Sequence, residues 1–241
     1  MLILVHHLST NLYFFMQKAV ILLSGGLDSA TCLALATKEG YECHTISFDY
    51  GQKQVCELNA AQKIAKQFHA TNKIINLNSL GEIAKSALTD EDVAIPDHQV
   101  DPDNIPCTYV PARNTVFISF ALAYAESLGA DYIYIGASSI DYSGYPDCRP
   151  DYFEQFQRLI NLATKVGVNG STITIKTPLA TLSKAETIKL GTDLGVNYAD
   201  TITCYRANSQ GQACGKCDSC HLRIKGFDDA GIKDPTLYTN S

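Results

Sequence analysis

The sequence predicts an α/β protein in which a doubly wound parallel sheet carries a small C-terminal appendage with four cysteines. Three observations lead to this prediction. Short β-branched runs alternate with segments of helical periodicity along most of the 241-residue chain, which is the pattern of βαβ units. A Ser-Gly-Gly turn directly follows the first apolar run, and four cysteines lie close together near the C-terminus.

The first half of the sheet is expected from three apolar runs separated by two helical segments. Strands are predicted at 19–23 (AVILL), 43–48 and 73–77, and helices at 29–38 and 57–68. Gly40 is placed to end the first helix. Because a helix lies between each pair of strands, we expect the strands to be parallel.

The second half repeats the same alternation. Helices are predicted at 115–128, 151–166 and 183–194, and strands at 132–136 (YIYIG) and 173–176. The last helix has the clearest boundaries: Ser183 and Glu186 have the spacing of a capping box at its start, and Gly195 is placed to stop it.

Two stretches lie outside this rhythm. Residues 89–106 (TDEDVAIPDHQVDPDNIP) are acidic and contain prolines, so we expect a long surface loop that is either a lid or disordered. The first 15 residues lack the basic start and cleavage site of a signal peptide. We therefore divide the chain into an N-terminal extension (1–15), a nucleotide-binding α/β domain (16–200) and a zinc-binding appendage (201–241).

Composition narrows the classes of function. Hydrophobic residues make up 46% of the chain and the formal net charge is −6, with a sequence pI of about 5.4. The chain has no run of lysine and arginine of the kind that binds nucleic acid, and its apolar stretches are too short to span a bilayer. Nine cysteines, clustered rather than evenly spread, favour metal over a disulfide scaffold. We expect a cytoplasmic protein that acts on small molecules.

The stretch VILLSGGLDSAT is typical of a phosphate-binding turn between a strand and a helix. Gly25 and Gly26 let the backbone approach an anion, Ser24 and Ser29 offer hydroxyl groups, and Asp28 can hold a Mg²⁺ that bridges phosphates. The lysine with which a Walker loop clamps the β- and γ-phosphates is missing. The turn therefore predicts a cradle for a departing pyrophosphate, with attack at the α-phosphate. A glycine-rich turn with a serine cap is the simpler alternative.

Four cysteines are spaced as C-x9-C-x2-C-x2-C in the segment CYRANSQGQACGKCDSC. They are Cys204, Cys214, Cys217 and Cys220. Four thiolates with no open position are typical of a structural Zn²⁺ site. An iron–sulfur cluster is the competing interpretation, but no other part of the chain suggests redox chemistry.

The segment SIDYSGYPDCRPDYF follows the fourth predicted strand and offers groups suited to a heterocycle that bears a carboxylate. Asp141 and Asp147 can accept hydrogen bonds from a ring N–H edge, and Tyr145 can stack on the ring. Arg149 can form a fork with a substrate carboxylate. A polar surface loop is the alternative interpretation.

Two further motifs contain candidate site residues. In YVPARN, Arg113 can pair with an acid, and Asn114 can either face the substrate or act as the N-cap of the following helix. In TPLATLSKAET, the capping box leaves Lys184 as a candidate phosphate contact beside a helix N-terminus.

Taken together, the motifs LSGGLDSATCL, FDYGQ, VPARN, SGYPDCR, TPLATLSKAE, TCY and CGKCDSCHLR resemble the 7-cyano-7-deazaguanine synthase family, part of the ATP pyrophosphatase (PP-loop) superfamily. The resemblance extends in colinear order from residue 16 to residue 227. SGYPDCR followed by the spaced cysteines is its most specific part. One departure is GQKQ, where the family more often has an arginine and a histidine after the glutamine, which leaves the roles of Lys53 and Gln54 open.

The resemblance implies an adenine nucleotide alpha-hydrolase-like fold and a ligase that forms a C–N bond. Its substrates would be 7-carboxy-7-deazaguanine, ammonia and two molecules of ATP, and its products the nitrile, AMP and pyrophosphate. It also implies Mg²⁺ with ATP, structural Zn²⁺ on the four cysteines, Arg113 or Arg149 near the substrate carboxylate, and a homodimer. The implied ATP-binding residues are Leu23, Ser24, Gly25, Gly26, Leu27, Asp28, Ser29, Ala30, Thr31, Cys32 and Leu33.

Other functions place different demands on the sequence. A tRNA-modifying enzyme of the same superfamily, such as a thiolase or lysidine synthase, needs a basic face. A zinc-ribbon nucleic-acid module needs arginine, lysine and aromatic residues around its cysteines. Neither pattern is found, so no nucleic-acid partner is expected. An amidotransferase fed by a glutaminase is a further alternative, because the sequence shows no glutaminase domain and ammonia must be free or delivered.

Overall fold

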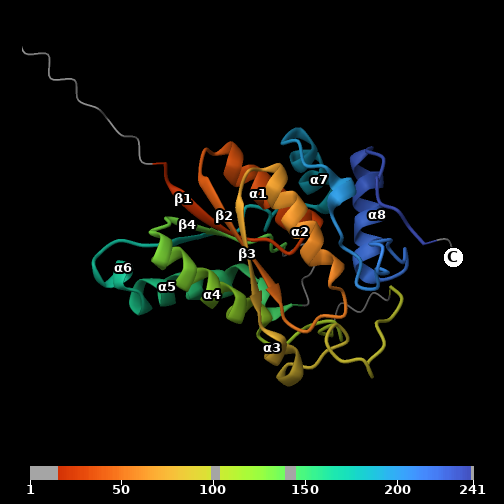
Figure 1. Cartoon of the computed structure of the whole chain (residues 1–241), viewed down its shortest axis with the longest axis horizontal. Helices are drawn as coiled ribbons and strands as arrows, with labels where there is room; N and C mark the ends of the chain where they lie inside the picture. The colour runs from red at the N-terminus through yellow and green to blue at the C-terminus, as the bar shows by residue number, and fades with distance from the viewer. Residues whose placement is uncertain (1–15, 99–103, 139–144, 240–241) are drawn as a thin grey trace, which may run out of the picture.

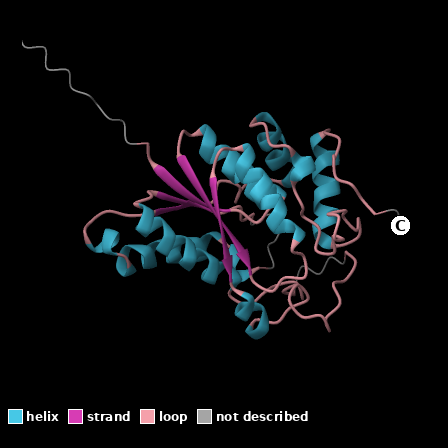
Figure 2. Cartoon of the chain, in the orientation of Figure 1, coloured by secondary structure: helices cyan, strands magenta, loops and turns pink. Residues whose placement is uncertain are grey.

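The computed structural model describes residues 16–98, 104–138 and 145–239. In this part of the chain five strands form one parallel sheet in the order β3-β2-β1-β4-β5 (Figure 1; Figure 2). The strands are β1 (Lys18–Leu22), β2 (Glu42–Asp49), β3 (Thr71–Asn76), β4 (Tyr132–Tyr134) and β5 (Thr174–Lys176). All five strands expected from the sequence are confirmed, and every pairing between neighbours is parallel.

Helices cover both faces of the sheet, as a doubly wound fold requires (Figure 1). On one face lie α1 (Leu27–Lys38), α2 (Cys56–Gln67) and α7 (Lys184–Asp193), and on the other α4 (Arg113–Leu128) and α5 (Pro150–Ala163). In β1, Ile21 packs with the first group of helices and Val20 with the second. Because successive strand side chains point to opposite faces, a strand buried on both sides reads as a continuous apolar run.

Five elements in the described part of the chain were not expected from the sequence. They are α3 (Asn78–Ile83), α6 (Lys165–Val168), α8 (Asp218–Ala230) and the 3-10 turns η1 (Pro146–Cys148) and η2 (Tyr198–Asp200). The most consequential is α8, which starts inside the cysteine cluster and packs against α7. The C-terminal segment is thereby held against the α/β core rather than standing apart from it.

Two predictions about helices are contradicted, while the remaining helix boundaries agree within two residues. The single helix predicted at 151–166 is wrong: Thr164 is extended (φ −112°, ψ 151°), and its side chain accepts a hydrogen bond from the Gly167 N–H to start α6. The alternative role of Asn114 as an N-cap is also wrong, because α4 begins at Arg113 after Ala112, a non-glycine residue with φ 55°. The capping box that starts α7 is confirmed in both directions.

The described part of the acidic loop rests on the cysteine segment. The His98 backbone N–H donates to the Lys216 carbonyl at 2.8 Å, and its ring stacks on His221 with centroids 3.8 Å apart. Arg206 Nη2 lies 2.5 Å from Asp97 Oδ1. Residues 89–98 and 104–106 of the predicted loop contain no helix or strand, as expected, whereas residues 99–103 lie outside the described residues. No described helix is both long enough and apolar enough to cross a bilayer.

Candidate active site

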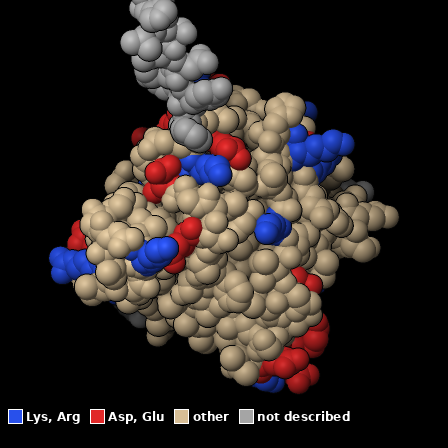
Figure 3. Space-filling view, turned by 60° about the vertical axis from the view of Figure 1, so that its left-hand side comes forward, with Lys and Arg blue, Asp and Glu red and all other residues tan. Residues whose placement is uncertain are grey.

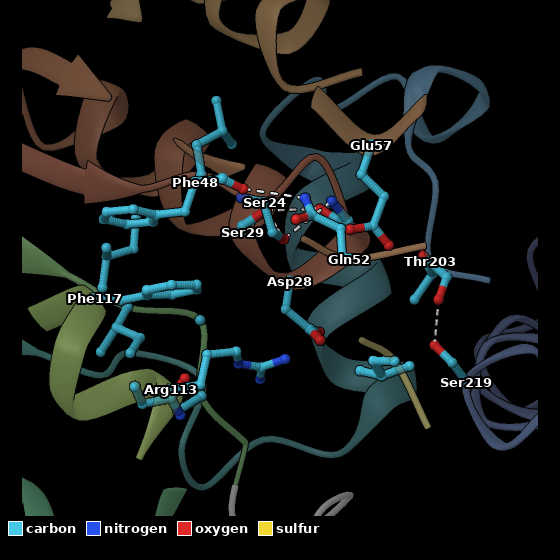
Figure 4. Close-up of a pocket in the computed structure, with 18 of the residues that line it drawn as sticks. Ser24, Asp28, Ser29, Phe48, Gln52, Glu57, Arg113, Phe117, Thr203 and Ser219 are labelled. Carbon is cyan, nitrogen blue, oxygen red and sulfur yellow. Dashed lines mark hydrogen bonds between the residues drawn. The ribbon is translucent and has the colours of Figure 1, made fainter. Parts of the chain in front are cut away.

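A cavity of about 240 Å³ opens at the carboxyl ends of β1, β2 and β4. The strand order places β1 beside β4, while the chain leaves β1 toward α1 on one face and leaves β4 toward α5 on the other. The two connections diverge and leave a crevice, which is where open α/β sheets bind ligands. The described site residues meet in this crevice (Figure 4).

Residues 24–29, here called the phosphate loop, form one side of the cavity. Gly25 has φ +91°, and a Cβ atom there would lie 2.2 Å from the carbonyl oxygen of Glu57 in α2. Its own carbonyl accepts a hydrogen bond from Ile202 N–H at 2.9 Å. Both the backbone conformation and the close approach therefore require glycine at this position.

The two loop serines are held by hydrogen bonds before any ligand arrives. Ser29 Oγ donates to the Gly26 carbonyl at 3.0 Å and accepts from the Ser24 backbone N–H at 3.2 Å. The two hydroxyl oxygens lie 3.1 Å apart. Among the described residues no side chain caps the start of α1 after Gly26. The first N–H groups of this helix are therefore available to an anion.

Asp28 and Lys184 form an ion pair at the mouth of the phosphate loop. Lys184 Nζ lies 2.8 and 2.9 Å from the two carboxylate oxygens, and its side chain is only 8% exposed. Gly226 of α8 sits against the lysine stem, because a Cβ there would lie 2.4 Å from Lys184 Cγ. The C-terminal helix thus holds this cation beside the loop.

The eleven residues predicted to bind ATP divide into two groups. Those that line the cavity are Leu23, Ser24, Gly26, Leu27, Asp28 and Ser29. Gly25 lies behind them, and Ala30, Thr31, Cys32 and Leu33 continue α1 with 0% exposure. The second group supports the loop from the core; Thr31 Oγ1, for example, lies 2.8 Å from the Tyr198 hydroxyl.

The far wall of the cavity, across from the phosphate loop, carries Arg113, Tyr145, Thr203 and Ser219. Glu57 lines the cavity from α2, beside the phosphate loop. Arg113 reaches in from the first turn of α4 (Figure 4). Burial works against its charge, but neighbouring Tyr50, Tyr145 and Asp147 raise the pKa of Arg113 above its ordinary value. The wall therefore carries a permanent positive charge.

Asn114 lines the cavity at this wall, and Asp147, which does not line it, supports Asn114. The Asn114 backbone N–H donates to Asp147 Oδ2 at 3.1 Å, and its side-chain amide donates to the Asp147 carbonyl at 3.0 Å and to Cys148 Sγ at 3.3 Å. Burial, followed by the charge of Asp147, raises the pKa of Cys148 to about 11. The thiol is therefore protonated at neutral pH and lines the cavity as a neutral group.

The remaining predicted substrate residues are placed differently. Tyr145 is buried, and its hydroxyl lies 2.8 Å from Thr108 Oγ1. Arg149 is exposed, precedes α5 and does not line the cavity. Asp141 lies outside the described residues. Of the two arginines considered for a substrate carboxylate, Arg113 alone lines the cavity in the described part of the chain.

Several cavity residues were not singled out from the sequence. Phe48 and Phe117 stack with ring centroids 4.1 Å apart and planes at 9°, and they make the apolar end of the cavity (Figure 4). Gln52 fixes the turn after β2, because it accepts from the Tyr50 N–H at 2.8 Å and donates to the Phe48 carbonyl at 3.1 Å. Only the FDYGQ motif at the end of a strand indicated this region.

The four predicted cysteine ligands converge. Their sulfur atoms all lie within 4.8 Å of one another, and the Cys204–Cys217 and Cys214–Cys220 pairs are 3.9 Å apart. A tetrahedral ion with Zn–S bonds of about 2.3 Å requires sulfur separations of about 3.8 Å. The group could therefore hold one metal ion.

The cysteine segment also completes the cavity. Thr203 and Ser219 both line it, and the Ser219 hydroxyl donates to the Thr203 carbonyl at 2.5 Å (Figure 4). Gly211 and Gly215, with φ of 80° and 72°, allow the backbone to turn around the sulfur atoms. The four-cysteine group and part of the cavity wall thus belong to one short segment.

A doubly wound sheet with a lysine-free SGGLDS loop at its switch point defines a nucleotide-binding enzyme of the PP-loop class. The family model described as queuosine biosynthesis protein QueC matches residues 18–231. The chain belongs to this family.

Relatives of known name agree with this assignment. The chain is 58% identical over 225 residues to a 7-cyano-7-deazaguanine synthase from Saccharophagus degradans, covering 93% of this chain and 99% of the relative. It is 59% identical over 223 residues to one from Coxiella burnetii (strain RSA 331 / Henzerling II), covering 92% and 98%. A solved structure of a predicted tRNA methyltransferase subunit from Methanocaldococcus jannaschii has a TM-score of 0.50 at 16% identity, with 93% of each chain covered, and shares the fold.

Proposed function

We propose that the protein converts 7-carboxy-7-deazaguanine and ammonia to 7-cyano-7-deazaguanine, with ATP cleaved to AMP and pyrophosphate. The single observation that carries this proposal is one cavity with a lysine-free phosphate loop on one side and Arg113 on the other. The loop suits a leaving pyrophosphate, and the arginine suits a substrate carboxylate. The names of the relatives supply the identity of the base.

The chemistry follows from the two sides of the cavity. The substrate carboxylate attacks the α-phosphate of ATP, an O–P bond forms and pyrophosphate leaves against the phosphate loop. Ammonia then displaces AMP to give the amide. A second ATP adenylates the amide oxygen, and loss of AMP and of the nitrogen-bound protons gives the nitrile. Catalysis of this kind rests on positioning and on stabilising the leaving charge.

We propose one orientation for ATP in the cavity. The apolar end, with Phe48 and Phe117, suits the adenine ring, and the residues 24–29 suit the phosphates. Asp28 is the carboxylate that would hold Mg²⁺, which supplies charge neutralisation of the departing pyrophosphate. We propose that Lys184, now paired with Asp28, contacts phosphate when ATP is bound.

The substrate base is assigned to the far wall. Arg113 would bind its carboxylate, and Tyr145 would bound the ring. Asn114 and Asp147 hold the start of α4, and so position Arg113, through their mutual hydrogen bonds. Asp141 and Arg149 remain predictions.

Zn²⁺ is the ion proposed for the four-cysteine group, because closed four-thiolate sites are typical of structural zinc. Backbone N–H groups of Arg206 and Cys214 donate to Cys204 Sγ, each at 3.2 Å, which suits a thiolate ligand. The ion would hold the segment that presents Thr203 and Ser219 to the cavity.

A homodimer is proposed from the surface over α4 and α5. Phe120 is 39% exposed, and Leu159 and Leu162 of α5 are 50% and 79% exposed. The face turned forward in Figure 3 has a broad area with few charged side chains. An apolar surface of this kind is typical of contact with a second copy. A cytoplasmic location and the lack of a nucleic-acid partner are proposed from the acidic composition.

A mass-spectrometric product assay tests the reaction. Zinc-loaded protein is incubated with 7-carboxy-7-deazaguanine, ammonium and Mg-ATP, and both base and nucleotide are followed. We expect the nitrile together with AMP, and accumulation of the amide when ATP is limiting. AMP without a base product would contradict the proposed substrate, and ADP would contradict the pyrophosphate-loop assignment.

A further inference from the structure

Glu57 is a cavity carboxylate that the proposed reaction has not yet used. It lies in the first turn of α2, where its backbone carbonyl packs against Gly25 of the phosphate loop. Its side chain lines the cavity and points inward from α2, while Arg113 enters from α4 on the opposite side (Figure 4). The carboxylate therefore stands where loop and far wall meet.

The other acidic side chains near the cavity already accept hydrogen bonds from protein groups. Asp28 accepts two from Lys184, and Asp147 accepts one from the Asn114 backbone. No residue in the described part of the chain donates a hydrogen bond to the Glu57 carboxylate, and Arg113 acts on it only through its charge. A half-buried carboxylate without donors is costly. It is suited to a ligand that brings N–H groups or positive charge.

The reaction brings such a ligand. Ammonia is largely ammonium at neutral pH, so it must lose a proton before its lone pair can attack the adenylated carboxylate. The other candidate acceptors that line the cavity are poorly suited: Cys148 is held as a neutral thiol, and the Gln52 side chain is occupied by backbone groups. Within the described cavity, Glu57 is the carboxylate with free acceptor atoms.

We propose that Glu57 is the catalytic residue that binds ammonium and accepts its proton in the amide-forming step. This inference rests on the proposed function. One N–H bond of ammonium breaks and its proton passes to the Glu57 carboxylate. The freed electron pair forms the C–N bond, and the C–O bond to AMP breaks with its electron pair leaving on AMP. A further N–H proton is released to solvent as the neutral amide forms.

The environment tunes Glu57 for this task. Burial raises its pKa from the ordinary value of 4.5 to about 8, with the charge of Arg113 acting in the opposite direction. General bases work best when their pKa lies near the pH at which they act. An ordinary surface carboxylate would be too weak a base to compete for a proton of ammonium.

The two half-reactions separate this role from substrate binding. Adenylation is followed as ATP–pyrophosphate exchange that depends on 7-carboxy-7-deazaguanine, without ammonium. Amide formation is followed by mass spectrometry after ammonium is added. In Glu57→Gln we expect exchange within about threefold of the wild type, and amide formation reduced by about 100-fold or more. Glu57→Asp should retain part of the second activity.

Hydroxylamine provides a second readout, because it is a much weaker base than ammonia and is already unprotonated at neutral pH. Formation of the hydroxamate by Glu57→Gln should therefore fall far less than formation of the amide. Glu154→Gln makes the same chemical change at an exposed position outside the cavity, and both half-reactions should match the wild type.

Each outcome decides the assignment. The assignment is supported if Glu57→Gln keeps ATP–pyrophosphate exchange but loses amide formation. Retained exchange also shows that this variant is folded. Loss of both activities would overturn it, because Glu57 would then bind the base or hold the phosphate loop. Unchanged amide formation would also overturn it. If the wild type itself shows no base-dependent exchange, the proposed function fails, and this inference fails with it.

Discussion

The phosphate loop and the far wall face each other across one cavity, but they are built in opposite ways. The loop consists of consecutive residues whose own hydrogen bonds, such as those joining Ser24, Gly26 and Ser29, fix its shape. The far wall gathers Arg113, Tyr145 and Thr203 from segments far apart in the chain. The loop is thus a local structure, whereas the wall exists only when the helices and the cysteine segment are packed.

The largest effect is expected from a side chain at Gly25, which should break the loop. Gly25→Ala places a Cβ 2.2 Å from the Glu57 carbonyl oxygen. We therefore expect ATP–pyrophosphate exchange that depends on 7-carboxy-7-deazaguanine to fall by about 100-fold or more. Gly40→Ala is the matched control, because Gly40 has a similar φ of +87° but nothing within 4 Å of the added atom. Equal losses in both variants would show that backbone strain, not the clash, is responsible.

Substitution of one of the four cysteines should disorder the far wall, although no residue of the phosphate loop is changed. Cys217→Ser, at a fully buried position, should lose bound zinc and lower the free energy of unfolding by on the order of 4 kcal/mol. Product formation should fall more than ATP affinity. Metal analysis, thermal unfolding and ATP titration test this, with Cys43→Ser as a buried cysteine outside the group. Full zinc content in Cys217→Ser would contradict the proposed ligand set.

Arg113→Lys tests whether the far wall binds the substrate carboxylate through the guanidinium group of Arg113. A lysine keeps the charge but cannot form the two-pronged contact with a carboxylate. We expect the KM for 7-carboxy-7-deazaguanine to rise about tenfold to a hundredfold, with ATP affinity unchanged. Arg149→Lys changes an exposed residue that does not line the cavity and should have no effect. The reverse result would assign the substrate carboxylate to Arg149.

The smallest effect concerns stability and pH. The pKa of Glu57 is raised in the folded protein from 4.5 to about 8, so the folded state binds this proton more tightly than the unfolded chain. The stabilising contribution of protonated Glu57 to the free energy of unfolding is fully present below pH 4.5 and is lost as the pH rises through 8. Glutamine stays neutral. The Tm of Glu57→Gln relative to wild type should therefore increase by a few degrees between pH 5 and pH 9, whereas a pH-independent difference would argue against the raised pKa.

Much of the fold was predictable because its signals are local. The five strands appear as apolar runs, and the box of Ser183 and Glu186 marks the start of α7 through hydrogen bonds between near neighbours. The single helix predicted at 151–166 failed, because the extended backbone at Thr164 is set by a side-chain contact that periodicity does not show. Helix α8 was missed because its first turn overlaps the cysteine motif.

The sequence by itself determined the class of fold, the position of the phosphate loop, the four-cysteine group and the resemblance to the family. Each depends on short motifs and apolar runs, which are recognised without knowing how distant segments pack. Only the tertiary structure decided that Lys184 pairs with Asp28 and that Arg113 lines the cavity while Arg149 does not. It also decided that no described residue donates a hydrogen bond to the Glu57 carboxylate. These choices depend on which helix ends meet at the edge of the sheet, and packing determines that over the whole chain.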